Sequence, residues 1–189
     1  MPPCQHAKAG MASSQRLVLA APRPKDVPEL LELVRASRHL HRPWVYAPRT
    51  RGVWARYLQR SRRGEIIAHV CRRRDTGEIV GVVNISEVVR GAFQSAYLGF
   101  YAHAGHARQG FMRDGLEAVL ARAFSALRLH RLEANIQPDN IASKALIKSL
   151  GFRREGLSRK YLKVGGRWRD HERWAITRDM WKERHRPRR

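Results

Sequence analysis

The sequence has few acidic residues, few cysteines and no long hydrophobic run. Of its 189 residues, 16 are Asp or Glu and 38 are Lys or Arg, which gives a formal net charge of +22. Its two cysteines are too few for a disulfide framework. No apolar run reaches the length of a membrane span, and the first residues lack the apolar stretch of a signal peptide. We therefore expect a globular chain in the cytoplasm, without membrane contact.

The cysteines and histidines do not indicate a metal site. Cys71 lies in an apolar, strand-like pattern that is typical of a small core residue, whereas Cys4 lies in the N-terminal segment. The nine histidines are scattered and show no spacing typical of metal ligands. We expect no metal.

The positive charge favours a polyanionic partner such as RNA, because basic side chains neutralise phosphates and release counterions. Within residues 35–63, basic residues cluster with the aromatic residues Trp44, Tyr46, Trp54 and Tyr57. The alternative is an arginine-rich surface that is merely solvated. No recognised nucleic-acid-binding motif accompanies the charge.

The chain divides into three segments by composition. Residues 1–15 are rich in Pro, Ala and Ser and are expected to form a flexible leader, with Met11 as a second candidate start. Residues 16–181 carry the patterned body, which we expect to be one domain. Residues 182–189 are expected to be a frayed basic tail.

Hydrophobic periodicity predicts an α/β chain of the α+β type, with a mixed, mostly antiparallel sheet of about seven strands and about four helices. Strand-like runs lie at 16–21, 65–74, 78–88, 93–102, 132–136, 152–156, 160–164 and 171–177. Helices are expected after the capping carboxylate of Asp26, after Thr50, after Gly110 and after Pro138, the last ending at Gly151. Residues 38–44 are expected to be irregular because Pro43 disfavours helix in its predecessor.

The stretch 107–112 joins the strand 93–102 to the helix that follows. Gly110 precedes the first helical turn, whose free N–H groups and positive dipole end favour phosphate. An ordinary strand–helix turn is the alternative. The strands 93–102 and 132–136 should be parallel neighbours, so a ligand cleft is expected where their C-terminal ends part.

Several motifs resemble a known family, the GCN5-related N-acetyltransferases (GNAT). The pyrophosphate-loop pattern Gln/Arg-x-x-Gly-x-Gly/Ala is matched at Gly110, whereas Ala107 and Met112 depart from it. The stronger signature is Arg131-Leu132-Glu133-Ala134-Asn135, Pro138-x-Asn140-x-x-Ser143, Leu150-Gly151-Phe152 and Glu155-Gly156. It is similar to the RimJ/RimL-type ribosomal-protein-alanine N-acetyltransferases. The stretches 38–44, 88–91, 97–99 and 166–171 resemble the alanine-specific members of that group. The similarity as a whole covers residues 16–181.

The resemblance implies the GNAT fold, with a splay between its two central parallel strands, and acetyl-CoA as co-substrate. It places the backbone of Phe100, Tyr101 and Ala102 along the pantetheine arm and the thioester. It places Arg108, Gln109, Gly110, Phe111 and Met112 around the pyrophosphate. Asn140 would hydrogen-bond the cofactor or the backbone of the site; alternatively, it simply caps its own helix.

The resemblance also implies direct transfer of the acetyl group to an amine. Ser143 is the candidate proton donor to the thiolate, since Ile147 stands where many relatives have a tyrosine; a plain helix-surface serine is the alternative. The base is open, because Lys160 and Tyr97 occupy the two positions where relatives carry glutamate. Glu133 and Glu87 remain as candidates that act through water.

Trp44, Tyr97 and Asn135 are the candidate acceptor-binding residues, although simple core packing is the alternative for Trp44. The leading function is acetylation of a protein N-terminus, in particular the N-terminal alanine of a ribosomal protein, with ribosome or rRNA contact through the basic surface. A neutral α-amine fits the weak set of bases, because its pKa near 8 lies well below that of lysine. The alternatives are acetylation of a small-molecule amine, or a non-catalytic RNA-associated module. Monomer and homodimer are both open.

Overall fold

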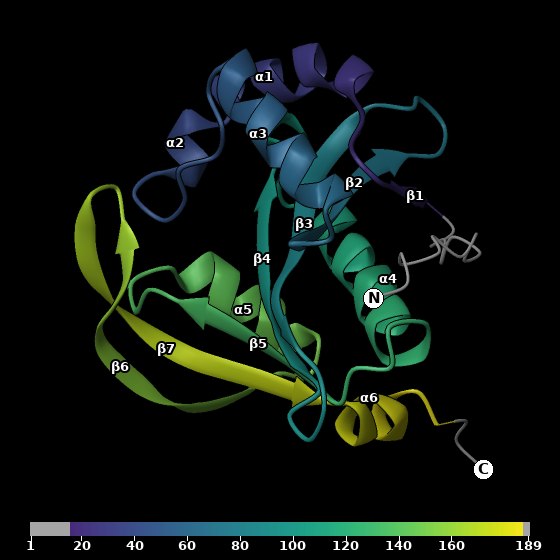
Figure 1. The fold of residues 1–189 in the computed structure, drawn as a ribbon, viewed down its shortest axis with the longest axis vertical. Coiled ribbons are helices and arrows are strands. Elements are labelled where there is room, and N and C mark those ends of the chain that lie inside the picture. Colours follow the sequence, from purple (N-terminus) through teal and green to yellow (C-terminus); the bar gives the residue numbers. More distant parts are fainter. Residues whose placement is uncertain (1–15, 187–189) are drawn as a thin grey trace.

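The computed structural model describes residues 16–186, so the predicted leader 1–15 and the last three residues lie outside the described part (Figure 1). Seven strands form one sheet in the order β1-β2-β3-β4-β5-β7-β6. The strands are β1 Leu17–Ala20, β2 Ile66–Arg73, β3 Ile79–Val89, β4 Ser95–Ala102, β5 Arg131–Ile136, β6 Arg153–Val164 and β7 Arg167–Thr177. Only β4 and β5 pair in parallel among these strands, and every other pair is antiparallel. The predicted mixed, mostly antiparallel sheet is confirmed.

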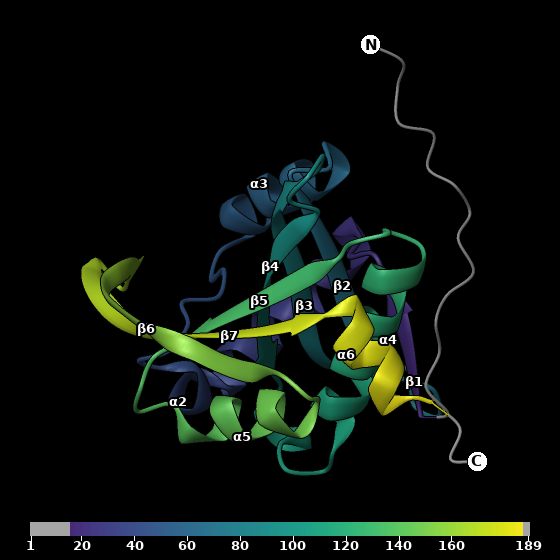
Figure 2. The same ribbon diagram turned by 90° about the horizontal axis from the view of Figure 1, so that it is seen from below.

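Helices cover both faces of the sheet. They are α1 Val27–Ala36, α2 Arg38–His41, α3 Arg51–Arg62, α4 Phe111–Ser125, α5 Ile141–Ser149 and α6 Arg178–Arg184, with 3-10 turns η1 Pro24–Asp26 and η2 Ala104–His106. Figure 2 shows α3 on one side of the sheet and α5 on the other. The core accordingly has two clusters, one under α4 and α5 and the other under α1 and α3. The described residues thus hold six α-helices where about four were predicted.

Local signals placed most helix ends correctly. Thr50 caps α3, its Oγ1 accepting from Val53 N at 3.3 Å. Gly151 follows α5 in the left-handed conformation, with φ +93°. Asp26, however, does not cap α1: its carboxylate accepts from the backbone N–H of Arg23 and pairs with Arg72 of β2. The expected capping role was wrong because a tertiary ion pair takes the carboxylate.

Two further boundaries differ from the prediction. Residues 38–41 form the short helix α2 rather than an irregular segment, since Pro43 acts only after its end. The runs 152–156 and 160–164 belong to one strand, β6, whose pairing with β7 shifts between Ser158 and Leu162. The helix α6 continues to Arg184, into the segment predicted as a tail.

The aromatic residues of the basic segment 35–63 mostly face inward. Trp54 is fully buried under α3, and Tyr57 donates its hydroxyl hydrogen to Asn84 Oδ1 at 2.6 Å. Of these aromatic residues, only Tyr46 is exposed, at 48 %, and the guanidinium of Arg42 lies 4.6 Å from the centre of its ring. Among the described residues, the close pairing of basic and aromatic side chains on this surface is therefore confined to Arg42 and Tyr46. Cys71 is fully buried, as predicted, and burial raises the pKa of its thiol to about 12.

No helix in residues 16–186 is long and apolar enough to cross a membrane. Within the same residues, no three His, Cys, Asp or Glu side chains are grouped so that they could hold a metal ion.

Candidate active site

The two central parallel strands separate after three residue pairs. Ser95, Ala96 and Tyr97 of β4 pair with Arg131, Leu132 and Glu133 of β5. Beyond that point β4 continues to Ala102 and β5 to Ile136, but the two strands no longer pair with each other. The splay expected at their C-terminal ends is therefore present, and it exposes strand backbone to a ligand.

The loop that enters α4 presents free backbone N–H groups. Gly110 is the N-cap, with φ +83°. The first backbone hydrogen bond into the helix runs from Asp114 N to Gly110 O at 3.2 Å. In the described part of the chain, no N–H group between Arg108 and Arg113 donates to a protein acceptor. Such a row of unsatisfied donors at a helix N-terminus fits the pyrophosphate that was predicted here.

Positive side chains reinforce this site. Arg16 donates to Gln109 O at 3.2 Å and pairs with Asp114 at 2.6 Å. Its guanidinium and that of Arg73 lie 4.8 and 5.2 Å from the centre of the Phe111 ring, so both charges border the start of α4. Arg108, the first predicted phosphate residue, has φ +60°.

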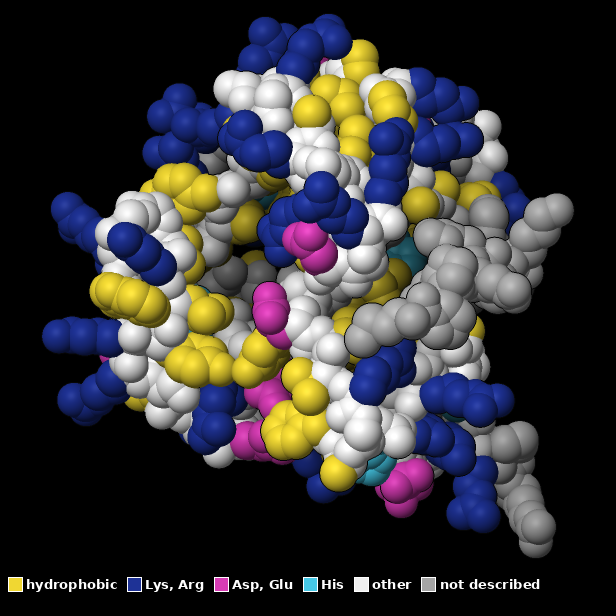
Figure 3. All heavy atoms as spheres, in the orientation of Figure 1, with side chains coloured by type: hydrophobic (Ala, Val, Ile, Leu, Met, Phe, Trp, Pro, Cys, Tyr) yellow, Lys and Arg dark blue, Asp and Glu magenta, His cyan; other side chains and the backbone are white. Residues whose placement is uncertain are grey.

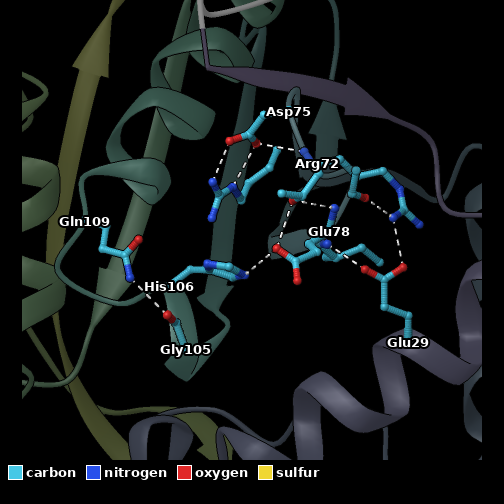
Figure 4. Close-up of polar contacts among 11 residues, drawn as sticks. Glu29, Arg72, Asp75, Glu78, Gly105, His106 and Gln109 are labelled. Carbon is cyan, nitrogen blue, oxygen red and sulfur yellow. Dashed lines mark hydrogen bonds and ion pairs between the residues drawn. The ribbon is translucent and has the colours of Figure 1, made fainter.

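Side chains fix the loop on its outer side (Figure 4). Gln109 Nε2 donates back to Gly105 O at 3.0 Å, and His106 Nε2 lies 3.8 Å from Glu78 Oε2 in the β2–β3 turn. The Gln109 side chain therefore shapes the loop and leaves the backbone for a ligand.

The predicted thioester strand offers its backbone rather than its side chains. Tyr101 is buried among the residues under α1 and α3, and Phe100 packs against the opposite cluster. His41 Nε2 lies 2.7 Å from Ala102 O, so this carbonyl is already engaged. Burial lowers the pKa of His41, which favours the neutral ring as donor to Ala102 O.

The helix α5 begins shortly after β5, with Asn140 and Ser143 four and seven residues after the end of that strand. Asn140 Oδ1 accepts from Ser143 N at 3.2 Å, which is the capping role weighed against a cofactor role. Its amide nitrogen and Ser143 Oγ have no hydrogen bond to another described residue. Both groups are thus available to a ligand.

On the other face of the splay, two tyrosines meet. Tyr97 lies at the last β4–β5 pair, and its hydroxyl is 3.1 Å from that of Tyr161 on β6. This hydrogen bond, burial, and the nearby charges of Glu133 and Glu87 raise the pKa of Tyr97 to about 12. Tyr97 therefore stays neutral near pH 7 and can orient a ligand but cannot act as a base.

The carboxylate of Glu133 is held in place by an arginine. Arg131 Nε donates to Glu133 Oε1 at 3.0 Å, and the same guanidinium pairs with Glu155 of β6. This pairing lowers the pKa of Glu155. Glu87, the other candidate base, is exposed at an irregular step of β3 with φ +49°.

Asn135 lies two residues beyond Glu133 and so on the same face of β5. Its Oδ1 is buried without a hydrogen-bond partner within the described residues, so it has unsatisfied capacity at the splay. Trp44 is half-buried, and its carbonyl accepts weakly from Gln137 Nε2 at 3.4 Å, just past the end of β5. The predicted acceptor residues therefore all border the splay.

Figure 3 shows a hollow on this side of the molecule, with a row of acidic side chains beside it and Lys and Arg around its rim. One wall is closed by a contact between distant segments: a side chain at Gly165 would collide with the ring of Tyr46. The turn between β6 and β7 therefore packs against the segment that joins α2 to α3. A separate cavity of about 470 Å³ lies on the outer side of α1, and no predicted site residue lines it.

Sequence reasoning missed four contributors to the site, namely Arg16, His41, Arg131 and Tyr161. Each acts through a tertiary contact that depends on strand register or loop packing. Tyr161 could have been found from the sequence. If residues 153–164 are taken as a single strand, Tyr161 lies within the strand that pairs with β7.

Comparison with known proteins identifies the family of the chain. Residues 16–153 match the family model described as the acetyltransferase (GNAT) domain. The ribosomal protein uS5-alanine N-acetyltransferase of Escherichia coli (strain K12) is 30% identical over 177 residues, covering 89% of this chain and 91% of that protein. The probable N-acetyltransferase YjcK of Bacillus subtilis (strain 168) is 37% identical over 98 residues, about half of either chain.

Solved structures agree with the fold. Mycobacterium smegmatis RimJ in complex with CoA-disulfide has a TM-score of 0.79 at 30% identity, covering 91% of this chain and 84% of that one. RimL, a ribosomal L7/L12 alpha-N-protein acetyltransferase in complex with coenzyme A, has a TM-score of 0.76 at 21% identity and covers 87% of this chain and 95% of that one. The predicted fold class is confirmed, and the chain belongs to the GNAT family of acetyltransferases.

Proposed function

We propose that this protein transfers the acetyl group of acetyl-CoA to the N-terminal α-amine of a protein, in particular the N-terminal alanine of a ribosomal protein. The observation that carries the proposal is the splay between β4 and β5. It connects the free N–H groups at the start of α4 with the face that holds Tyr97, Glu133 and Asn135. A donor and an acceptor can therefore meet there from opposite sides.

The donor side holds the cofactor mainly through backbone. The N–H groups from Arg108 to Met112, with the guanidinium of Arg16 beside them, would bind the pyrophosphate. The backbone of 100–102, which pairs with β3 but not with β5, would line the pantetheine arm and polarise the thioester carbonyl. Acetyl-CoA supplies the activated acetyl group when it is bound.

The acceptor side must remove one proton from the amine. Glu133 keeps one carboxylate oxygen free while Arg131 holds the other, so it can accept that proton through a water molecule. The demand on this base is small, because an α-amine with a pKa near 8 is partly neutral at pH 7. Tyr97 and Asn135 would orient the amine.

The departing thiolate needs a proton. Ser143 Oγ lies on the first turn of α5 and has no competing hydrogen bond to another described residue, which supports it as the donor. The cap bond from Ser143 N to Asn140 Oδ1 fixes the backbone of the same turn, which also supports this role.

A chain terminus fits this acceptor side better than a small cationic amine. The contact of Tyr46 with the β6–β7 turn and the adjacent Trp44 narrow the approach to one end of a chain with a small first residue. A polycation would need carboxylates without cationic partners, whereas Glu133 and Glu155 both pair with Arg131. The ribosomal-protein acetyltransferases among the relatives add support. The proposal includes a cytoplasmic setting and contact with ribosomal RNA through the basic surface.

Two matched peptides test this function. One begins with alanine and has no lysine; the other has a blocked N-terminus and one internal lysine. We expect acetyl-CoA-dependent mass gain on the first alone, read by mass spectrometry. Equal acetylation of the lysine peptide, or preferential acetylation of spermidine, would overturn the proposed acceptor.

Binding of acetyl-CoA is measured separately from acetyl transfer. Saturating acetyl-CoA should raise the melting temperature, since a ligand bound only by the folded state stabilises it. No shift would indicate a fold without a working cofactor site.

A further inference from the structure

The hairpin formed by β6 and β7 carries more basic side chains than it has acidic partners for them. Residues 153–173 include eight Lys or Arg and three acids. All three acids are engaged inside the molecule: Glu155 with Arg131, Asp170 with the backbone N–H of Lys160, and Glu172 with Lys144, Arg154 and Trp174. No free acid is left to balance the basic side chains of the hairpin.

Five of those basic side chains are exposed toward the hairpin tip, namely Arg159, Lys160, Lys163, Arg167 and Arg169. None of them pairs with a carboxylate in the described part of the chain. By contrast, Arg72, Arg73 and Arg131 elsewhere in the sheet are each paired with an acid. The hairpin tip thus presents uncompensated positive charge.

An aromatic ring stands among these charges. Trp168 is 60 % exposed, lies directly opposite Lys163 in the β6–β7 register and follows Arg167. Its indole makes no ring contact and no hydrogen bond with another described residue. A free indole face beside several cations matches the combination that binds an unpaired base together with its flanking phosphates.

The register argues against two other occupants. Leu162 pairs with Arg169, next to the Lys163–Trp168 pair, so the two exposed apolar side chains nearest the tip point to opposite faces of the hairpin. The third, Leu157, pairs with Glu172, four residues along β7 from Trp168. The exposed apolar side chains accordingly form no continuous face to insert into a membrane. A second copy of this +22 chain would bring like charges together, which disfavours self-association through the tip.

We propose that the tip of the β6–β7 hairpin is a binding site for single-stranded RNA, with one base stacked on Trp168 and phosphates contacted by Lys163 and Arg167. The strand must be unpaired because only then is a base face open for stacking. The site lies beside the acceptor hollow, since the same turn contacts Tyr46. It rests on the RNA contact that is part of the proposed function and gives that contact a place, but it does not depend on the acetyl transfer.

The test uses the full chain without acetyl-CoA and a fluorescently labelled 12-nucleotide RNA of mixed sequence, read by polarisation. We expect Trp168→Ala to weaken binding about tenfold and Trp168→Phe to retain most of it, because Phe keeps a stacking face. Lys163→Gln combined with Arg167→Gln should also lower the slope of log affinity against log salt by about 1.4, two phosphate contacts on a single strand.

A double variant with the same charge change elsewhere is the control. Arg62→Gln on α3 with Lys148→Gln on α5 removes two exposed cations distant from the tip. The proposal is overturned if this control loses as much affinity as the hairpin double variant, or if Trp168→Ala binds like the parent. Binding to vesicles of anionic lipid but not to RNA, or loss of a dimer in the Trp168→Ala variant by sedimentation, would also overturn it.

Discussion

Asn140 and Ser143 lie at the start of α5, shortly after the end of β5. The capping bond from Ser143 N to Asn140 Oδ1 fixes the turn and leaves the serine hydroxyl without a protein partner among the described residues. A hydroxyl that is held in position but not already bonded can donate a proton in the reaction. This residue should therefore affect turnover more than binding.

Ser143→Ala should lower kcat by about tenfold to a hundredfold, the usual contribution of a positioned proton donor, with donor affinity nearly unchanged. The measurement is steady-state kinetics on an alanine peptide, together with calorimetric titration of coenzyme A. Ser149→Ala, on the same helix, is the matched control, because its hydroxyl is exposed and bonds only to Leu146 O. Equal rates for the Ser143 variant and the parent would remove it from the mechanism.

At the scale of elements, we expect the start of α4 to bind the pyrophosphate of the cofactor. The left-handed backbone at Gly110 turns the chain so that the next N–H groups point outward together. A Cβ there would lie 3.1 Å from Arg16 Nη2 and inside the approach to these N–H groups. The glycine thus serves both conformation and access.

Gly110→Ala should raise the dissociation constant for coenzyme A at least tenfold and cost about 1 kcal/mol in stability, the usual penalty for alanine in the left-handed region. Gly77→Ala is the control: Gly77 has φ +77° in the β2–β3 turn with nothing near its Cβ position. It should lose similar stability and keep its affinity, as measured by chemical denaturation and calorimetry. Equal affinities for both variants would show that the loop does not bind the pyrophosphate.

The elements could be predicted where signals are local. Hydrophobic alternation placed β2 to β5, and Thr50 and Gly151 marked helix ends. The single strand β6 was divided in the prediction because its shift in register between Ser158 and Leu162 interrupts the alternation. Asp26 lost its capping role to Arg72, a partner 46 residues away. Such long-range competition leaves no trace in a local pattern.

The site could be predicted only in part for the same reason. Gly110, Asn140 and Ser143 belong to short motifs whose spacing survives in the sequence. The ion pair between Arg131 and Glu155, and the contact of Tyr97 with Tyr161, join residues from two strands and follow from sheet order alone. The orphaned Oδ1 of Asn135 is a property of packing and has no counterpart in the sequence.

At the scale of the whole molecule, the burial of several histidines makes the free energy of unfolding depend on pH. Burial is the largest cause that lowers the pKa of His41, His103 and His171, so the folded state keeps their rings neutral below the usual range. The strongest case is His69 of β2, only 5 % exposed, whose pKa falls to about 4 through burial and the nearby charge of Arg122. Unfolding releases each ring to bind a proton.

For His69, the unfolded ring gains its proton near pH 6.5 and the folded ring only near pH 4. Between these values the unfolded state binds more protons, so the free energy of unfolding should fall by about 3 kcal/mol as the pH is lowered from 6.5 to 4. His69→Leu removes this group together with its unpartnered Nδ1. We therefore expect the free energy of unfolding of the variant, measured in urea, to fall less between pH 7 and pH 4.5 than that of the parent protein. If the two proteins lose the same stability on acidification, His69 is already protonated in the folded state, and its burial does not govern the acid response.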